Sequence, residues 1–99
     1  MIGVIATIKV KDSKEVEFEN IAVKLVNAVN VEEEDNLFYR LYKQSSHVYI
    51  IMEGYKDKDK DAFTRHTKTS HYKKYGKAMA EFLKGVPQVI VMDELAPRK

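Results

Sequence analysis

The stretch Val48–Tyr72, VYIIMEGYKDKDKDAFTRHTKTSHY, decides the fold expected of this chain. Its first residues alternate as those of a β-strand do, a run of alternating Lys and Asp follows, and helical spacing then begins. The stretch also collects side chains that exchange protons or accept hydrogen bonds: Glu53, His66, His71, Tyr49, Tyr55 and Tyr72. We therefore expect any functional site to have its centre here.

The residues before the Lys/Asp run predict a β-hairpin. Strands over residues 36–43 and 47–55 are joined by a short turn over 44–46. Both strands carry apolar residues on two faces. Glu53 and Tyr55 share one face with Tyr49, so their role depends on which face the helices cover.

A strand and a helix are predicted ahead of the hairpin. Residues 2–10 alternate as a strand, and Ile5 adds an apolar group to its second face. Asp12 and Ser13 are typical helix-start residues because their oxygens accept from free backbone N–H groups. We expect this helix to end near Asn30. Its apolar stripe follows helical spacing: Phe18, Ile21, Ala22, Leu25, Ala28 and Val29.

A second helix and a last strand are predicted after the hairpin. Lys56–Asp61 alternates in charge and is expected to be a solvated loop. A helix then starts at Asp61, has room for a bend within residues 68–72, and ends at Gly85. Its apolar stripe comprises Ala62, Phe63, His66, Tyr72, Tyr75, Gly76, Met79, Phe82 and Leu83. Residues 86–92 read as a strand, and 94–99 as a polar tail.

The element order β-α-β-β-α-β predicts an α+β, ferredoxin-like fold with an antiparallel sheet, in one domain over residues 1–99. Two helices cover only one face of such a sheet. Because three of the strands are apolar on both faces, we expect a homodimer in which two sheets pack face to face.

Composition excludes several other classes. The net charge of +2 is too small to favour nucleic acid or an anionic membrane surface. The chain has no cysteine, which excludes disulfides and thiolate chemistry. No apolar run is long enough to span a membrane, and the N-terminus does not resemble a signal peptide, so we expect a cytoplasmic protein.

The candidate site is centred on His66. Next to Phe63 on the buried stripe, its ring should point at the sheet, where Glu53 and Tyr55 would meet it if their face is the helix side. A carboxylate, a phenol and an imidazole in an apolar pocket are typical of a small-molecule site. The alternative is a buried Glu–His pair that only ties the helix to the sheet.

A metal site is not expected. His71 follows His66 by five residues, roughly 140° around an unbroken helix, so the two rings meet only if the helix bends. The acidic run Glu32–Asp35 reads as a solvated loop, because hard-cation loops place ligands at alternate positions. Residues 71–75 mix basic and aromatic side chains as nucleic-acid binders do, but Tyr72 and Tyr75 belong to the core stripe.

One known pattern fits these residues in order: Glu53-x-Tyr55, then Ala62-Phe63, His66 and Thr69-Ser70-His71-Tyr72. With a Glu-x-aromatic strand end and a helix carrying His, four residues and His, the chain resembles the antibiotic-biosynthesis monooxygenase domain family. Asp35–Tyr39 is similar to that family's acidic-Pro-Gly-Asn-Leu-x-Tyr strand start, and Ile5–Val10 also fits.

The resemblance implies a dimeric α+β barrel with one pocket in each protomer. Family members include cofactor-independent oxygenases of quinols and polyphenols, and a relative processes phosphorylated autoinducer-2. The chain departs from the pattern at Glu34-Asp35, which replaces Pro-Gly, and in a longer Lys56–Asp61 loop. It has no tryptophan, which the related haem-degrading enzymes place beside the haem.

We therefore expect a monooxygenase that acts on a small phenolic or quinol-type substrate with O₂, without cofactor or metal. The catalytic residues would be His66 as general base, with Glu53 and Tyr55. Substrate contacts are expected from Asn36, Tyr39, Phe63, His71 and Tyr72, with Tyr55 or Asn36 as the donor to a developing oxyanion. The alternatives are an isomerase of a small oxygenated metabolite and a non-enzymatic ligand-binding dimer.

Overall fold

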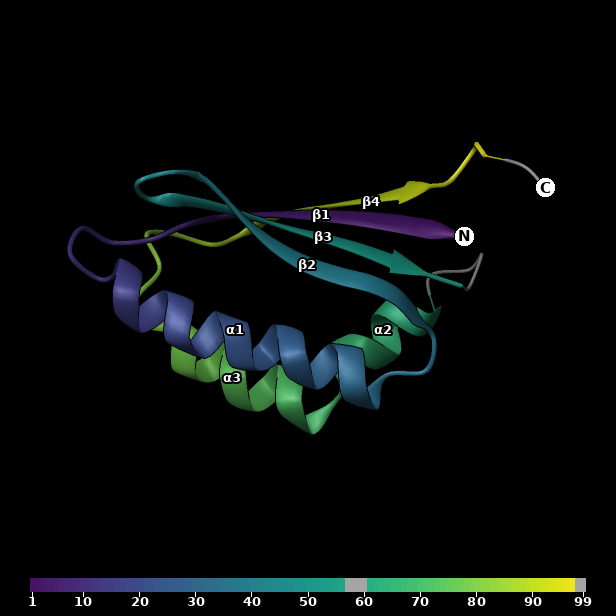
Figure 1. The fold of residues 1–99 in the computed structure, drawn as a ribbon, viewed down its shortest axis with the longest axis horizontal. Coiled ribbons are helices and arrows are strands. Elements are labelled where there is room, and N and C mark those ends of the chain that lie inside the picture. The colour runs from purple at the N-terminus through teal and green to yellow at the C-terminus, as the bar shows by residue number, and fades with distance from the viewer. Residues whose placement is uncertain (57–60, 98–99) are drawn as a thin grey trace.

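The sheet carries its helices on one face, as the element order predicts (Figure 1). The structure, a computed structural model, describes residues 1–56 and 61–97. Its elements are β1 (Ile2–Lys9), α1 (Glu15–Glu32), β2 (Asn36–Ser45), β3 (Val48–Tyr55), α2 (Asp61–Thr67), α3 (Ser70–Ala80) and β4 (Gln88–Asp93). Within these residues the strands form one antiparallel sheet in the order β2-β3-β1-β4. This is the predicted ferredoxin-like fold, with its second helix divided in two. Most of the predicted charged loop, residues 57–60, lies outside the described part.

The core lies between the helices and the inner face of the sheet. β1 buries alternate residues, and α1 buries one stripe: Ile2, Val4, Ala6 and Ile8 from the strand, and Phe18, Ala22, Leu25 and Val29 from the helix. In β3 the buried set is Tyr49, Ile51, Glu53 and Tyr55. Glu53 and Tyr55 therefore lie on the helix side, which the sequence left open.

Both ends of α1 differ from the prediction. Ser13 adopts a φ of 66°, Lys14 takes the N-cap position without a side-chain cap, and the Asp12 carboxylate lies 3.4 Å from the His47 ring. At the other end, the Asn30 amide donates to Val26 O at 2.7 Å and to Tyr39 O at 3.1 Å. Because Asn30 ties the last turn to β2 rather than stopping it, the helix continues to Glu32.

The predicted second helix breaks between Thr67 and Ser70. The Thr69 hydroxyl accepts from the backbone N–H of Tyr72 at 3.3 Å and donates to the backbone carbonyl of His66 at 2.7 Å. One side chain thus caps the start of α3 and adds a second hydrogen bond to the His66 carbonyl near the end of α2, which also accepts from the Thr69 backbone N–H. The break lies where the sequence left room for a bend, so His66 and His71 come from two helices rather than from one.

The end of α3 also differs from the prediction. The helix stops at Ala80, and Leu83 forms a β-bridge with Val10. The amide of Lys11 donates to Phe82 O, and the amide of Lys84 donates to Lys9 O, both at 2.8 Å. Phe82 and Leu83 therefore pack against the core from a turn that pairs with the chain at the end of β1, and not from a longer helix.

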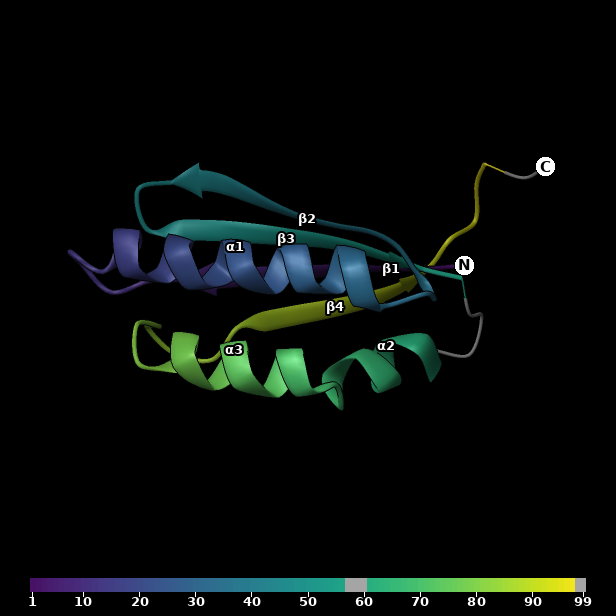
Figure 2. The ribbon, with the colours of Figure 1, turned by 60° about the horizontal axis from the view of Figure 1, so that its bottom comes forward.

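The outer face of the sheet is turned away from the helices (Figure 2), and large apolar side chains are exposed on it. β2, β3 and β4 place large side chains there, all 40–58% exposed: Tyr42, Met52, Ile90 and Met92. Ile5, Phe38 and Ile50 lie half-buried on the same face. Several large apolar side chains exposed on one face are typical of an interaction surface.

Candidate active site

A cavity of about 330 Å³ lies between the helices and the inner face of the sheet. Most of its wall is apolar, and it includes Ala6, Ile8, Phe18, Leu25, Ile51, Phe63 and Met79. The polar side chains in the wall are Tyr39, Glu53, His66, Tyr72, Lys73 and Lys77. An apolar hollow with a few convergent polar groups is the usual form of a small-molecule site.

His66 is the imidazole in this wall, and its two ring nitrogens have different surroundings. It is 1% exposed, and Nδ1 lies 2.7 Å from a Glu33 carboxylate oxygen. Nε2 faces Glu53, whose nearest carboxylate oxygen is 3.9 Å away, beyond hydrogen-bond range. The arrangement suits the tautomer in which Nδ1–H donates to Glu33 and Nε2 keeps its lone pair. Burial lowers the pKa of His66, against the opposing effect of the Glu33 hydrogen bond.

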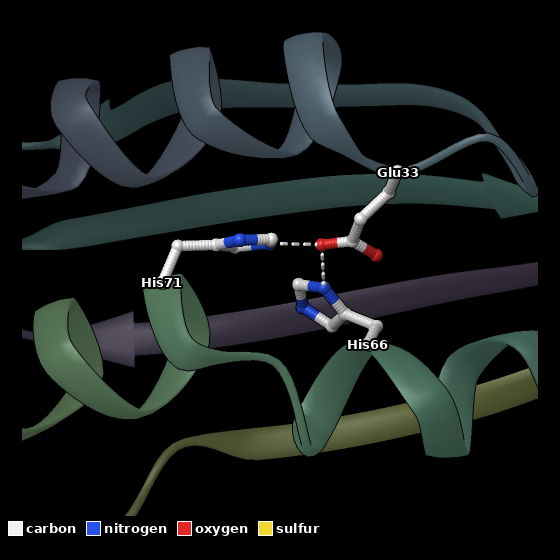
Figure 3. Close-up of side chains that lie close together, drawn as sticks. All are labelled: Glu33, His66 and His71. Atoms are coloured by element: carbon white, nitrogen blue, oxygen red, sulfur yellow. Dashed lines mark hydrogen bonds and ion pairs between the residues drawn. The ribbon is translucent and has the colours of Figure 1, made fainter.

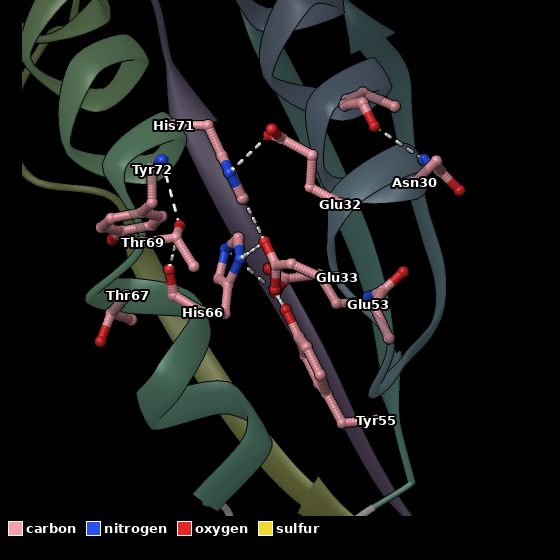
Figure 4. A network of polar contacts seen from close by, with 12 residues as sticks. Asn30, Glu32, Glu33, Glu53, Tyr55, His66, Thr67, Thr69, His71 and Tyr72 are labelled. Atoms are coloured by element: carbon pink, nitrogen blue, oxygen red, sulfur yellow. Dashed lines mark hydrogen bonds and ion pairs between the residues drawn. The ribbon is translucent and has the colours of Figure 1, made fainter.

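Glu53 is a buried carboxyl with one strong donor. It is 4% exposed, and the Tyr55 hydroxyl donates to it at 2.6 Å (Figure 4). Burial raises the pKa of Glu53 to about 7, although the Tyr55 hydrogen bond acts in the opposite direction. Near neutral pH, the carboxyl opposite His66 Nε2 can therefore be neutral or ionised.

Aromatic rings surround the His66 imidazole. The ring centroids of Tyr72 and Tyr39 lie 4.8 Å and 5.2 Å from it, and those of Tyr55 and Phe63 lie 6.0 Å and 6.2 Å away. Burial also raises the pKa of Tyr39 and of Tyr72. Both phenols thus stay protonated and can donate hydrogen bonds at the cavity wall.

His71 belongs to a polar cluster beside the cavity (Figure 3). Its Nε2 bonds to the same Glu33 oxygen that meets His66, and its Nδ1 lies 3.0 Å from a Glu32 carboxylate oxygen. One ligand-type atom from each of Glu33, His66 and His71 lies within 4.8 Å of the others. Two imidazoles and a carboxylate of this kind can hold a metal ion.

The structure brings most of the predicted site residues together. His66, Glu53, Tyr39, Phe63 and Tyr72 line the cavity. Three others do not belong to the wall described for it: Asn36, Tyr55 and His71. The Asn36 amide donates to the backbone carbonyls of Phe38 and Gly54, at 2.9 Å and 3.3 Å. Asn36 and Tyr55 are thus engaged in holding β2, β3 and Glu53 in place.

Glu33 is the site residue that the sequence reasoning missed, and its assignment to a solvated loop was wrong. Its side chain is only 10% exposed and bonds to two imidazoles. A signal was present, because Glu33 follows Val29 by four residues and so continues the buried stripe of α1. The three neighbouring acidic residues concealed it.

The fold and the site define an α+β domain with a mostly apolar, imidazole-containing pocket between its helices and its sheet. The chain belongs to the antibiotic biosynthesis monooxygenase family, whose sequence profile it matches over residues 1–78. A search of curated protein sequences gave no significant match. In the described part of the chain, no helix is long and apolar enough to cross a membrane.

Solved structures give the same family and fold. A Caulobacter crescentus protein, named provisionally as an antibiotic biosynthesis monooxygenase, is 34% identical with a TM-score of 0.87, over 96% of this chain and 90% of its own. A conserved Methanosarcina mazei protein is 23% identical with a TM-score of 0.86, over 94% of this chain and 91% of its own. A Nitrosomonas europaea protein with a similar provisional name is 17% identical with a TM-score of 0.88, over 97% of this chain and 100% of its own. The last two similarities concern the fold alone.

Proposed function

We propose that the protein is a cofactor-independent monooxygenase that oxidises a small phenolic or quinol-type substrate with O₂. The observation that carries this proposal is the orientation of His66 in the wall of a mostly apolar cavity, with Nδ1 on Glu33 and Nε2 toward Glu53. Membership of the family supports the class of reaction.

The first step is proton transfer from the substrate hydroxyl to His66 Nε2. The lowered pKa of His66 keeps the imidazole neutral and ready to accept this proton. The Glu33 carboxylate then stabilises the imidazolium through Nδ1–H. Tyr55 fixes Glu53 on the far side of Nε2, where the carboxyl can hydrogen-bond to the substrate or to the protonated ring.

The phenolate is electron-rich enough to pass one electron to O₂. The two radicals combine at a ring carbon that carries hydrogen, and a peroxide forms. That carbon then loses its proton, a C=O bond forms as the O–O bond breaks, and hydroxide leaves as water after taking up a proton. The net reaction converts a phenol and O₂ into a quinone and water, and the substrate supplies all the electrons.

The cavity stabilises negative charge at the substrate oxygen through neutral donors. We assign the donor role to Tyr39 and Tyr72, and not to Tyr55 or Asn36 as expected from the sequence, because Tyr39 and Tyr72 line the cavity. Burial keeps both phenols protonated. A mostly apolar site strengthens such hydrogen bonds relative to water.

Oxygen uptake with a panel of quinols and phenols tests the proposal. We expect substrate-dependent O₂ consumption, and one atom of isotopically labelled O₂ in each quinone product. An isomerase would convert its substrate equally well without O₂, and a binding protein would be thermally stabilised by a ligand without consuming it. Uptake no faster than that of His66→Ala across the panel would rule out the oxygenase.

We also propose that two chains pair through the outer faces of their sheets. Tyr42, Met52, Ile90 and Met92 supply an exposed apolar surface opposite the helices. A second copy would cover it and leave the cavity of each protomer on the far side of its sheet. Membership of the family supports pairing of this kind.

A further inference from the structure

We propose that Glu33, His66 and His71 together bind one divalent first-row transition-metal ion. The three side chains come from the end of α1, from α2 and from the start of α3, and they point toward one another (Figure 3). Each offers a different ligand atom: Glu33 Oε2, His66 Nδ1 and His71 Nε2. The cluster forms because α2 and α3 are separate helices.

The spacing of these atoms is close to what a metal requires. Bonds of about 2.0–2.1 Å to nitrogen and oxygen, in tetrahedral geometry, place neighbouring ligand atoms about 3.3 Å apart. His66 Nδ1 is 2.7 Å from Glu33 Oε2, and all three atoms lie within 4.8 Å of one another. A metal would therefore need only small rotations of the side chains. Glu33 follows the last helical residue of α1, so its backbone is not held within the helix.

The opposite nitrogen of each ring also faces a carboxylate. His71 Nδ1 lies 3.0 Å from Glu32 Oε2, and His66 Nε2 lies 3.9 Å from Glu53 Oε1. Histidines that bind metals usually donate their second N–H to a carboxylate or a carbonyl, which fixes the ring and strengthens the ligand. The contact at His71 has this geometry already, and the one at His66 is close to it.

The cluster has its own route to solvent. A surface hollow of about 250 Å³ is lined by Glu33, Glu34, Asp35, Arg65, His66 and Thr69. Of these residues, only His66 also lines the larger cavity. The hollow has three carboxylates and one guanidinium, Arg65, which pairs with Asp35. The remaining negative charge favours the approach of a cation, which can reach Glu33 without crossing the apolar cavity.

The ligand set indicates which ions would bind. Two imidazoles with one carboxylate suit Zn²⁺, Co²⁺, Ni²⁺ or Cu²⁺, whereas Mg²⁺ and Ca²⁺ prefer sites made of oxygen. With three protein ligands, coordination positions remain for water or another small ligand.

Metal binding and the proposed base chemistry exclude each other at His66. Nδ1 cannot donate a proton to Glu33 and bind a metal at the same time, and a metallated ring carries its proton on Nε2. We therefore expect Zn²⁺ to inhibit the oxygenase reversibly. This consequence rests on the proposed function, but the metal site itself does not.

Titration of the full-length, chelator-treated protein with Co²⁺ tests the site, because bound Co²⁺ absorbs visible light. We expect a saturable band at one Co²⁺ per chain that Zn²⁺ abolishes. Glu33→Gln and His71→Ala should weaken Co²⁺ binding by at least about 100-fold, since even the partners of ligands contribute 10–100-fold. The control variants are Glu34→Gln, in the same hollow, and His47→Ala, which removes the remaining histidine.

Each outcome decides the matter. The absence of a band in the native protein overturns the site, as does an equal loss in His47→Ala or a band unchanged by Glu33→Gln. Glu33→Gln keeps the shape of the side chain, so we expect this variant to fold. Circular dichroism verifies that it does. A band with no oxygenase activity would retain the metal site and refute only the proposed function. Oxygenase activity without a Co²⁺ band would retain the proposed function and refute only the metal site.

Discussion

At the scale of single residues, the imidazole of His66 has two distinct sides because only Nδ1 has a carboxylate at hydrogen-bond distance. Glu33 fixes the tautomer and leaves Nε2 at the cavity. If His66 is catalytic, removal of its ring lowers turnover; if it only ties the helix to the sheet, removal lowers stability.

Substitution of His66 by Ala should lower turnover by roughly 10²–10⁴-fold, the usual contribution of a general base. The fold should survive, because Glu33 keeps its bond to His71 and the cavity can admit water where the ring was. Melting temperature and kcat are to be measured together, with His47→Ala as the control. His71→Ala is not a neutral control, since His71 shares Glu33 with His66. A lower melting temperature with unchanged kcat would show that His66 has a structural role and is not the general base.

A second prediction concerns Tyr49, whose hydroxyl donates to Glu19 and so ties β3 to α1. This hydrogen bond, together with Lys43, lowers the pKa of Glu19. Hydrogen bonds to charged groups contribute about 1.5–3 kcal/mol, and the half-exposed Glu19 suggests the lower end of that range for Tyr49→Phe at neutral pH.

The pH dependence gives this prediction its sign. Because the pKa of Glu19 is lower in the folded state, its contribution is present above the unfolded value and is lost as pH falls through the folded one. The urea-unfolding free energies of Tyr49→Phe and the parent should therefore converge at acidic pH. A constant difference from acidic to neutral pH would show that the hydroxyl acts independently of the charge on Glu19.

At the scale of elements, the break between α2 and α3 creates the polar cluster. An unbroken helix would have turned His71 roughly 140° from His66. Instead, Thr69 ends one helix and starts the next, and the two ring centroids lie 6.4 Å apart. The break that the Thr69 hydroxyl caps thus allows His66 and His71 to bond to the same Glu33 carboxylate.

Removal of this hydroxyl should be measurable. Thr69→Ala should lower the free energy of unfolding by about 1 kcal/mol, the usual loss for an N-cap residue. The matched control is Thr67→Ala, because the Thr67 hydroxyl donates only to Thr64 O in the preceding turn. Urea unfolding of both variants compares them. An equal decrease in the free energy of unfolding of Thr69→Ala and Thr67→Ala would mean that the Thr69 cap does not stabilise the break between α2 and α3.

The strands and the apolar stripe of α1 could be predicted because alternation and helical spacing are written directly in the sequence. Glu53 and Tyr55 could be placed on a common face, but not on the helix side, because β3 is apolar on both faces. The bend near Thr69 was foreseen only as a possibility. Helix ends depend on partners distant in sequence, such as Tyr39 O for Asn30 and Val10 for Leu83, which no local pattern reveals.

At the scale of the whole molecule, the sheet separates two surfaces with different roles. The helices lie on its inner face (Figure 2), and the cavity lies between them and this face, with the polar cluster beside it. Its outer face presents apolar side chains that no helix in the described part of the chain covers. Substitutions on the outer face should therefore change association before they change the chemistry.

Met52 is the residue that tests this separation. It lies near the centre of the outer face, opposite Ile5 on β1 and Arg40 on β2, and is 42% exposed.

Apolar burial contributes about 25 cal/mol per Å², and a stable interface buries about 1,200–2,000 Å² in total. We expect the native chain to sediment as a dimer at micromolar concentration and Met52→Lys to shift it toward the monomer, because the introduced ammonium would be buried without a partner. Val31→Lys, on the helix side and 84% exposed in the native chain, should leave the dimer intact. Sedimentation velocity of the three proteins gives the answer, and a native chain that sediments as a well-folded monomer would refute pairing through this face.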